Sequence, residues 1–207
     1  MILSYISLAA AAVCGVLRCV LGHYAFSAAT TLLCACAAAC SRNVGLNLAL
    51  VAGLLVSVVA DWFLAHQKID SNRFLYGVLG FFAAHCLFAW QAGMRFSFNT
   101  AFLVIALVLL VGYGVYMAAR VLPKVESGLR VPLILYMLVS VASLYFALSM
   151  DAPLLPRILY IVGIAAILFS DTMIAENEFL HQAWAGKLVL PFYYACHVLI
   201  TLSFLLQ

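Results

Sequence analysis

The amino-acid sequence predicts an all-α, polytopic membrane bundle of about eight transmembrane helices. Hydrophobic residues make up 68% of the chain and charged residues 8%, and the mean hydropathy is +1.19. This composition leaves too few polar groups to cover the surface of a soluble domain. A helix needs about 20 apolar residues to cross a bilayer, so 207 residues hold eight such helices only if the connections are short. We therefore expect residues 1–207 to form a single integral membrane domain.

Long apolar runs, separated by short polar breaks, define the expected helices in chain order. The run behind Met1 lacks the basic segment that opens a signal peptide, so we interpret it as an uncleaved span. The eight expected spans cover residues 2–17, 24–40, 44–65, 74–91, 98–119, 131–149, 157–175 and 187–206. The breaks are rich in polar residues, Gly and Pro, as at 123–128 and 151–153. The weakest break is 18–23; if the first two spans merged, the count would be seven and the termini would face opposite sides.

The distribution of Lys and Arg predicts the orientation in the membrane, because basic loops stay in the cytoplasm. Seven of the ten basic residues follow odd-numbered spans: Arg18, Lys68, Arg73, Arg120, Lys124, Arg130 and Lys187. The other three, Arg42, Arg95 and Arg157, follow even-numbered spans. Both termini are therefore expected outside the cytoplasm, in the inner membrane if the source is a bacterium. No loop contains the dense basic run that nucleic-acid binding requires, so no nucleic-acid partner is expected.

The seven cysteines lie within or beside apolar spans, where cysteine usually behaves as a small buried hydrophobe. They are Cys14, Cys19, Cys34, Cys36, Cys40, Cys86 and Cys196. The pair Cys34 and Cys36 has no second pair or His at zinc-site spacing, so a structural metal is not expected.

Two polar motifs recur in the same order in the two halves of the chain, 1–96 and 97–207. Residues 60–65 read ADWFLA and residues 170–175 read SDTMIA; residues 81–87 read FFAAHCL and residues 193–199 read YYACHVL. Asp171 lies 110 residues after Asp61, and His197 lies 112 residues after His85. These offsets predict two four-helix repeats, which would share one orientation because each contains an even number of helices.

The depth of these groups predicts one shared site. Helical side chains lean toward the N-terminus of their helix. The Asp side chains therefore lean toward the membrane centre and the His side chains lean toward the cytoplasm, so each Asp approaches a His. A single intramembrane Asp or His can serve helix packing, but an ionisable group costs about 2.5 to 3.5 kcal/mol at mid-span, and four together favour a functional cavity. We expect Asp61, His85, Asp171 and His197 to line it. Its expected aromatic walls are Phe81, Phe82, Tyr193 and Tyr194.

Three further polar residues lie beside these motifs. Ser57 lies one turn before Asp61 and could orient its carboxylate, although a serine in a membrane helix often bonds to its own backbone. Glu178 falls on the same face as Asp171 if that helix continues. Glu176 is expected to be a solvated boundary residue, as are His66, His181 and Asp70.

These motifs resemble the YhhN-like lysoplasmalogenases, a family of small eight-span membrane enzymes. The resemblance covers nearly the whole chain and is carried by Asp61, the sequence LGFFAAHCLF at 79–88, the pair Ser170 and Asp171, and the aromatic pair before His197. One departure is that the family commonly opens its second span with Lys-Pro, where this chain reads HYAFS at 23–27. Arg18 or His23 would then have to replace that lysine as a phosphate contact.

The resemblance implies hydrolysis of the vinyl ether bond of a lysoplasmalogen to a fatty aldehyde and a glycerophospho-ethanolamine or glycerophospho-choline. Protonation of the β-carbon gives an oxocarbenium ion that water attacks, so one acid and one base are needed, as in glycosidases. Burial and a neighbouring like charge favour the protonated form of one carboxyl while its partner stays ionised. Asp61 and Asp171 are the expected catalytic residues. The expected substrate-binding residues are His85, His197, Phe81, Phe82, Tyr193, Tyr194 and Ser57; no cofactor is expected, and the partners are a lysophospholipid and the surrounding membrane lipids.

Two alternatives remain open at the level of the sequence. His85, His197, Asp61 and Asp171 could bind a catalytic metal in a hydrolase of another lysolipid or of an amide lipid. Bound metal in the purified protein would favour that class. A proton-coupled small-solute transporter also uses repeats and midplane Asp and His, but it would need a polar pathway to the outer face. Nothing in the sequence specifies an oligomeric state.

Overall fold

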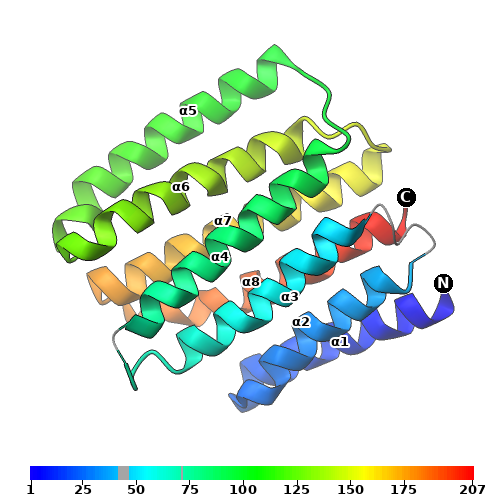
Figure 1. The fold of residues 1–207 in the computed structure, drawn as a ribbon, viewed down its shortest axis with the longest axis horizontal. Helices are drawn as coiled ribbons and strands as arrows, with labels where there is room; N and C mark the ends of the chain where they lie inside the picture. The colour runs from blue at the N-terminus through cyan, green and yellow to red at the C-terminus, as the bar shows by residue number, and fades with distance from the viewer. Residues whose placement is uncertain (42–46, 71) are drawn as a thin grey trace.

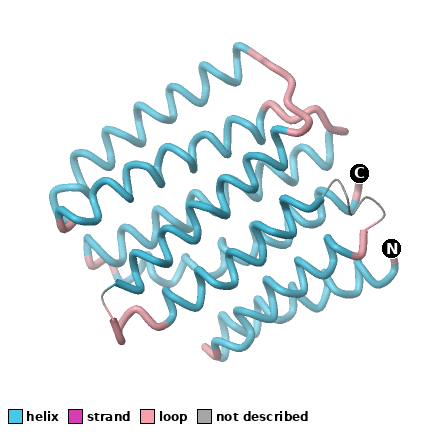
Figure 2. Tube along the Cα trace, in the orientation of Figure 1, coloured by secondary structure: helices cyan, strands magenta, loops and turns pink. Residues whose placement is uncertain are grey.

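The computed structural model describes residues 1–41, 47–70 and 72–207, and within these ranges 87% of the residues are helical and no strand is present (Figures 1 and 2). The eight α-helices are α1 (Ile2–Leu21), α2 (Tyr24–Ala39), α3 (Leu48–Ala65), α4 (Asn72–Gly93), α5 (Thr100–Tyr116), α6 (Ser127–Leu148), α7 (Leu154–Leu180) and α8 (Ala183–Leu205). Seven of them have the length and hydropathy needed to cross a membrane. The fold class is confirmed, and the chain is a multi-pass membrane protein.

Helix α2 is the exception, because its 16 residues extend only about 24 Å, less than the roughly 30 Å of the hydrocarbon core. It contains mainly small residues, and Ala35, Ala37 and Ala38 are buried against its neighbours. The predicted start of the third span at residue 44, and Arg42, lie outside the described residues.

Helices α1 and α2 are separate, so the alternative of a merged first span is wrong. Gly22 ends α1 with a φ of 74°, a left-handed conformation that glycine adopts without a steric penalty, and its N–H bonds to the carbonyl of Arg18. Tyr24 then begins α2. The polar break at 18–23 is thus a real turn, and both termini lie at the same end of the bundle (Figure 1).

Two predicted helix ends are corrected by the structure. The seventh span was expected to end at residue 175, but α7 continues to Leu180, with Glu176 buried and bonded to Tyr116 and with Glu178 on the wall of a polar cavity. The chain then reverses at His181, which has a φ of 56°. Helix α5 changes at Met117 into a π-helical turn, Met117–Val121, which is followed by the short 3-10 segment Leu122–Lys124.

Seven helices form a closed ring, and α5 lies outside it. Neighbouring helices pack in the order α1, α2, α3, α4, α6, α7, α8 and back to α1, and α2 also contacts α8. Figure 1 shows α5 at the edge of the bundle beside α6. Only Ala106 of α5 is buried, so this helix presents most of its surface to the surrounding lipid.

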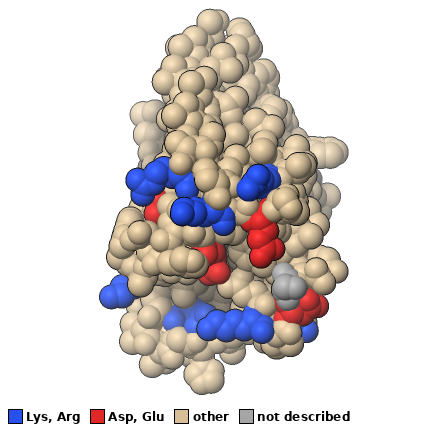
Figure 3. Space-filling model, turned by 90° about the vertical axis from the view of Figure 1, so that its left-hand side faces the viewer, with Lys and Arg blue, Asp and Glu red and all other residues tan. Residues whose placement is uncertain are grey.

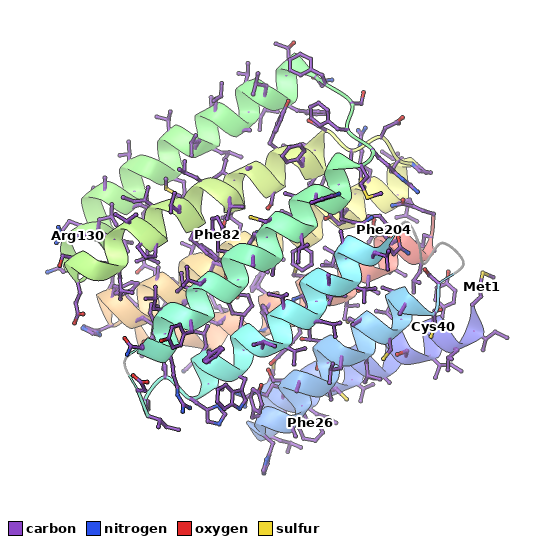
Figure 4. The ribbon with its side chains drawn as sticks, viewed as in Figure 1. Met1, Phe26, Cys40, Phe82, Arg130 and Phe204 are labelled. Atoms are coloured by element: carbon purple, nitrogen blue, oxygen red, sulfur yellow. The ribbon has the colours of Figure 1, made fainter. Side chains whose placement is uncertain are left out.

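The two ends of the bundle differ in how many basic residues they carry. The loops that follow α1, α3, α5 and α7 meet at one end, which Figure 3 shows face on, with basic and acidic side chains close together. Arg130 marks this end in Figure 4, whereas Met1, Cys40 and Phe204 lie toward the other. At the opposite end, an isolated bridge between Phe96 and Met150 ties the α4–α5 loop to the α6–α7 loop. We refer to the first end as the basic end.

We expect the basic end to face the cytoplasm, which places both termini on the outer side. A C-terminal reporter that is active only in the cytoplasm should therefore give no signal, and a reporter inserted after Lys68 should be active. Strong cytoplasmic activity of the C-terminal fusion would contradict this orientation.

Candidate active site

A cavity of about 320 Å³ enters the ring of helices from the basic end. Residues of α1, α2, α3, α4, α7 and α8 line it. Both Asp61 and Asp171 lie on its wall, together with Phe81 and Tyr193. The two carboxyls therefore share one space that a small polar group can enter.

Asp61 is held by side chains from two other helices. The hydroxyl of Tyr193 on α8 donates to its Oδ2 at 3.0 Å. Ser27 on α2 lies 3.5 Å from the same oxygen and 2.6 Å from the hydroxyl of Tyr194. Arg18, at the end of α1, lies on the same cavity wall. Asp61 thus lies between hydroxyl donors inside the bundle and a cation near the basic end.

Asp171 has a different and tighter set of partners. Tyr136 of α6 donates to its Oδ2 at 2.7 Å, and Nε2 of His85 on α4 lies 3.1 Å from the same atom. His85 is fully buried, and its Nδ1 lies 3.4 Å from Ser143. Since a carboxylate only accepts hydrogen bonds, His85 must donate through Nε2 when Asp171 is ionised. Two donors converging on one oxygen stabilise the ionised carboxylate.

A second, apolar pocket meets the polar cavity at Asp171. It lies between α4, α6, α7 and the end of α5, and it has a volume of about 40 Å³. Its walls include Phe74, Val78, Met117 and Met137. Asp171 lies on the walls of both spaces, as do Leu64, Phe74, Phe81 and Ile174. The site therefore changes from polar to apolar at this carboxylate.

Five of the expected site residues do not line the cavity, although one of them, His85, contacts Asp171. His197 is fully buried and contacts neither Asp; its Nδ1 lies 3.1 Å from Thr31, and its ring packs on Tyr193. Ser57 donates to the carbonyl of Gly53 in its own helix, so it does not orient Asp61. Tyr194 does not line the cavity, and its hydroxyl lies 2.6 Å from that of Ser27. Phe82 is half-buried and does not line either space.

The acidic residues at the end of α7 differ from one another. Glu178 lines the polar cavity, as expected if the helix continues past Asp171. Glu176 is buried and accepts a hydrogen bond of 2.6 Å from Tyr116. The expectation that Glu176 is a solvated boundary residue is therefore wrong, because the end of α5 covers it.

The described residues contain no group of three or more His, Cys, Asp or Glu placed to hold a metal ion. Asp171 pairs with His85, whereas Asp61 and His197 have separate partners. The cysteines are all free thiols; Cys34 and Cys196 are buried, and Cys19, Cys36, Cys40 and Cys86 lie on the outer surface of the helices. The expectation of burial therefore holds for only some of them.

Sequence reasoning missed Tyr136 and Ser27, the two contacts of the carboxylates from α6 and α2. Neither belongs to a repeated motif, and each looks like an ordinary helix residue in its span. A polar side chain within a long apolar run was the only available signal. The pairing with a given Asp depends on how the helices are rotated against each other.

A family model described as the YhhN family matches residues 22–204, which is most of the chain. The comparison with curated proteins and the comparison with solved structures each gave no match.

Proposed function

The chain belongs to the YhhN family, whose members include lysoplasmalogenases, and on this premise we propose that it hydrolyses the vinyl ether bond of a lysoplasmalogen. The observation that carries the proposal is the position of Asp171, where a polar cavity meets an apolar pocket. In the substrate, the vinyl ether lies between a polar glycerophosphate and a hydrocarbon chain. The order of surfaces in the protein therefore matches the order of groups in the lipid.

The two carboxyls supply an acid and a base for this reaction. Transfer of a proton from one carboxyl to the β-carbon of the vinyl ether forms the C–H bond and leaves an oxocarbenium ion. The other carboxylate takes a proton from the water that attacks the α-carbon. The resulting hemiacetal gives its hydroxyl proton to the carboxylate that acted as the acid, and its glycerol oxygen takes the proton from the other carboxyl as the C–O bond breaks. This step yields the aldehyde and the free glycerol hydroxyl and restores both carboxyls. Glycosidases use the same pair of carboxyl groups to form and hydrolyse a similar cation.

The hydrogen bonds support an assignment of the two roles. Tyr136 and His85 both stabilise Asp171 in its ionised form, so we assign Asp171 as the base. Asp61 receives one donor at 3.0 Å and a more distant one at 3.5 Å, so we assign it as the acid. Arg18 on the same wall is the expected contact for the lipid phosphate.

Purified protein incubated with a matched panel of lysolipids tests the proposed reaction. The panel contains 1-alkenyl, 1-acyl and saturated 1-alkyl lysophospholipids with identical headgroups and chain lengths. We expect free aldehyde from the alkenyl lipid and no product from the alkyl lipid, which carries no vinyl ether to protonate. Release of fatty acid from the acyl lipid without any aldehyde from the alkenyl lipid would refute the proposal and indicate an ester hydrolase.

A further inference from the structure

The apolar pocket at Asp171 is too small to hold a long hydrocarbon chain. Its volume is about 40 Å³. A lipid whose vinyl ether lies at Asp171 must therefore extend its chain out of the pocket. The question is which surface of the protein receives the rest of the chain.

A much larger apolar groove lies directly beyond the pocket. It runs between α5, α6 and α7 on the lipid-facing side of the bundle and has a volume of about 570 Å³. Val108, Val141, Leu168 and Phe169 are among its walls. All of these residues lie within spanning helices, so the groove is open to the hydrocarbon region of the bilayer, where lipid chains are.

One aromatic side chain is shared by the pocket and the groove. Tyr113 of α5 lines both spaces. Its hydroxyl lies 3.1 Å from Oγ1 of Thr172, which in turn donates to the carbonyl of Leu168. Thr172 lines the groove and directly follows Asp171, which lines the pocket. The groove therefore leads to the catalytic carboxylate past the ring of Tyr113.

Helix α5 is attached in a way that permits such a passage. It packs against α6 outside the ring (Figure 1), and only Ala106 along its length is buried. Its side chains reach α7 through two hydrogen bonds near its C-terminal end, Tyr113 to Thr172 and Tyr116 to Glu176. Beyond this end, Met117 and Val121 are buried in a core cluster with Leu133 and Ala175, so the passage past Tyr113 requires movement of that side chain and not of the helix end.

We propose that the groove between α5, α6 and α7 is the binding site for the hydrocarbon chain of the substrate lipid, which reaches Asp171 laterally from the bilayer past Tyr113. This inference rests on the proposed function for the identity of the lipid. The groove itself selects a single apolar chain, because the walls other than the Tyr113, Tyr116 and Thr172 hydroxyls are apolar.

Two glycines of α5 provide a matched pair of variants. A Cβ added to Gly112 or to Gly114 would meet no atom within 4 Å, so a side chain can leave the backbone at either position without a clash. Gly112 lines the groove and Gly114 does not. Gly112→Phe therefore fills the groove, and Gly114→Phe is the control with the same change in size and helix propensity.

Photo-crosslinking measures occupancy of the groove without requiring turnover. The probe is a saturated 1-alkyl lysophosphatidylethanolamine with a diazirine at the end of its chain. We expect labels on α5, α6 and α7 around Val108, Val141 and Phe169, a loss of at least about tenfold in Gly112→Phe from steric exclusion, and no change in Gly114→Phe. Labelling spread evenly over the lipid-facing helices, or equal loss in both variants, would overturn the proposal.

Rates of aldehyde release test the groove separately from the proposed vinyl ether reaction. With a long-chain alkenyl lysolipid, Gly112→Phe should release aldehyde at least about tenfold more slowly than Gly114→Phe. With an analogue whose chain ends inside the apolar pocket, the two variants should be equal. If the native protein released no aldehyde but the groove labels were lost in Gly112→Phe alone, the vinyl ether reaction would be wrong and the chain-binding groove would stand. Equal rates with the long chain would remove the groove from the mechanism.

Discussion

Replacing Asp171 with Asn is expected to reduce aldehyde release by about 10²- to 10⁴-fold, the usual contribution of general acid–base catalysis. Asn keeps the size of Asp, and its amide oxygen still accepts a hydrogen bond from Tyr136. The packing between α6 and α7 should therefore survive. The amide neither takes a proton from water nor donates one as an acid. The measurement is the initial rate with an alkenyl lysolipid, on protein that elutes as a single species in detergent.

Asp61→Asn should cause a loss of similar size, and the double variant should be little worse than either single one. Acid and base act as a unit, so removing one already stops the reaction. Asp151→Asn is the matched control, because Asp151 is exposed and lies at the opposite end of the bundle from the cavity. Substantial hydrolysis by a well-folded Asp61→Asn or Asp171→Asn protein would leave that carboxyl with a role in helix packing alone.

Replacing Gly163 with Val is expected to destabilise the bundle by about 1 to 3 kcal/mol, the usual cost of overpacking a core. A Cβ at Gly163 would lie 2.6 Å from Cγ2 of Ile200, 3.2 Å from the Ile200 nitrogen and 3.3 Å from the Cys196 carbonyl. The last two atoms belong to the backbone of α8 and cannot move without shifting that helix. Small residues that allow such close approach are typical of helix interfaces in membranes.

Thermal unfolding in detergent should show this effect as a lower midpoint for Gly163→Val. Gly114→Val is the control, because its side chain enters open space on α5. Aldehyde release should fall as well, since α7 and α8 carry Asp171 and Tyr193. Equal midpoints for the two variants would show that α7 and α8 can separate slightly at no cost.

The sequence alone determined the helices and the ends at which their loops meet. Apolar runs of about 20 residues and the polar breaks between them are local properties, so eight helices could be placed within a few residues of their observed positions. The break at Gly22 was the weakest in the sequence, and the left-handed turn there keeps α1 and α2 apart. The positions of the motifs in their spans also predicted how deep Asp61 and Asp171 lie in the membrane, because each helical residue adds a fixed rise.

The tertiary structure alone decided which side chains meet. Spacing along a helix gives depth, but the rotation of each helix about its axis depends on contacts with neighbours distant in the chain. For this reason Asp171 is paired with His85 and Tyr136, while His197 is turned toward Thr31. The same packing placed α5 outside the ring, although α5 is as apolar as the helices within it. Hydropathy predicts that a helix lies in the membrane, whereas close packing of side chains decides which helices enclose the site.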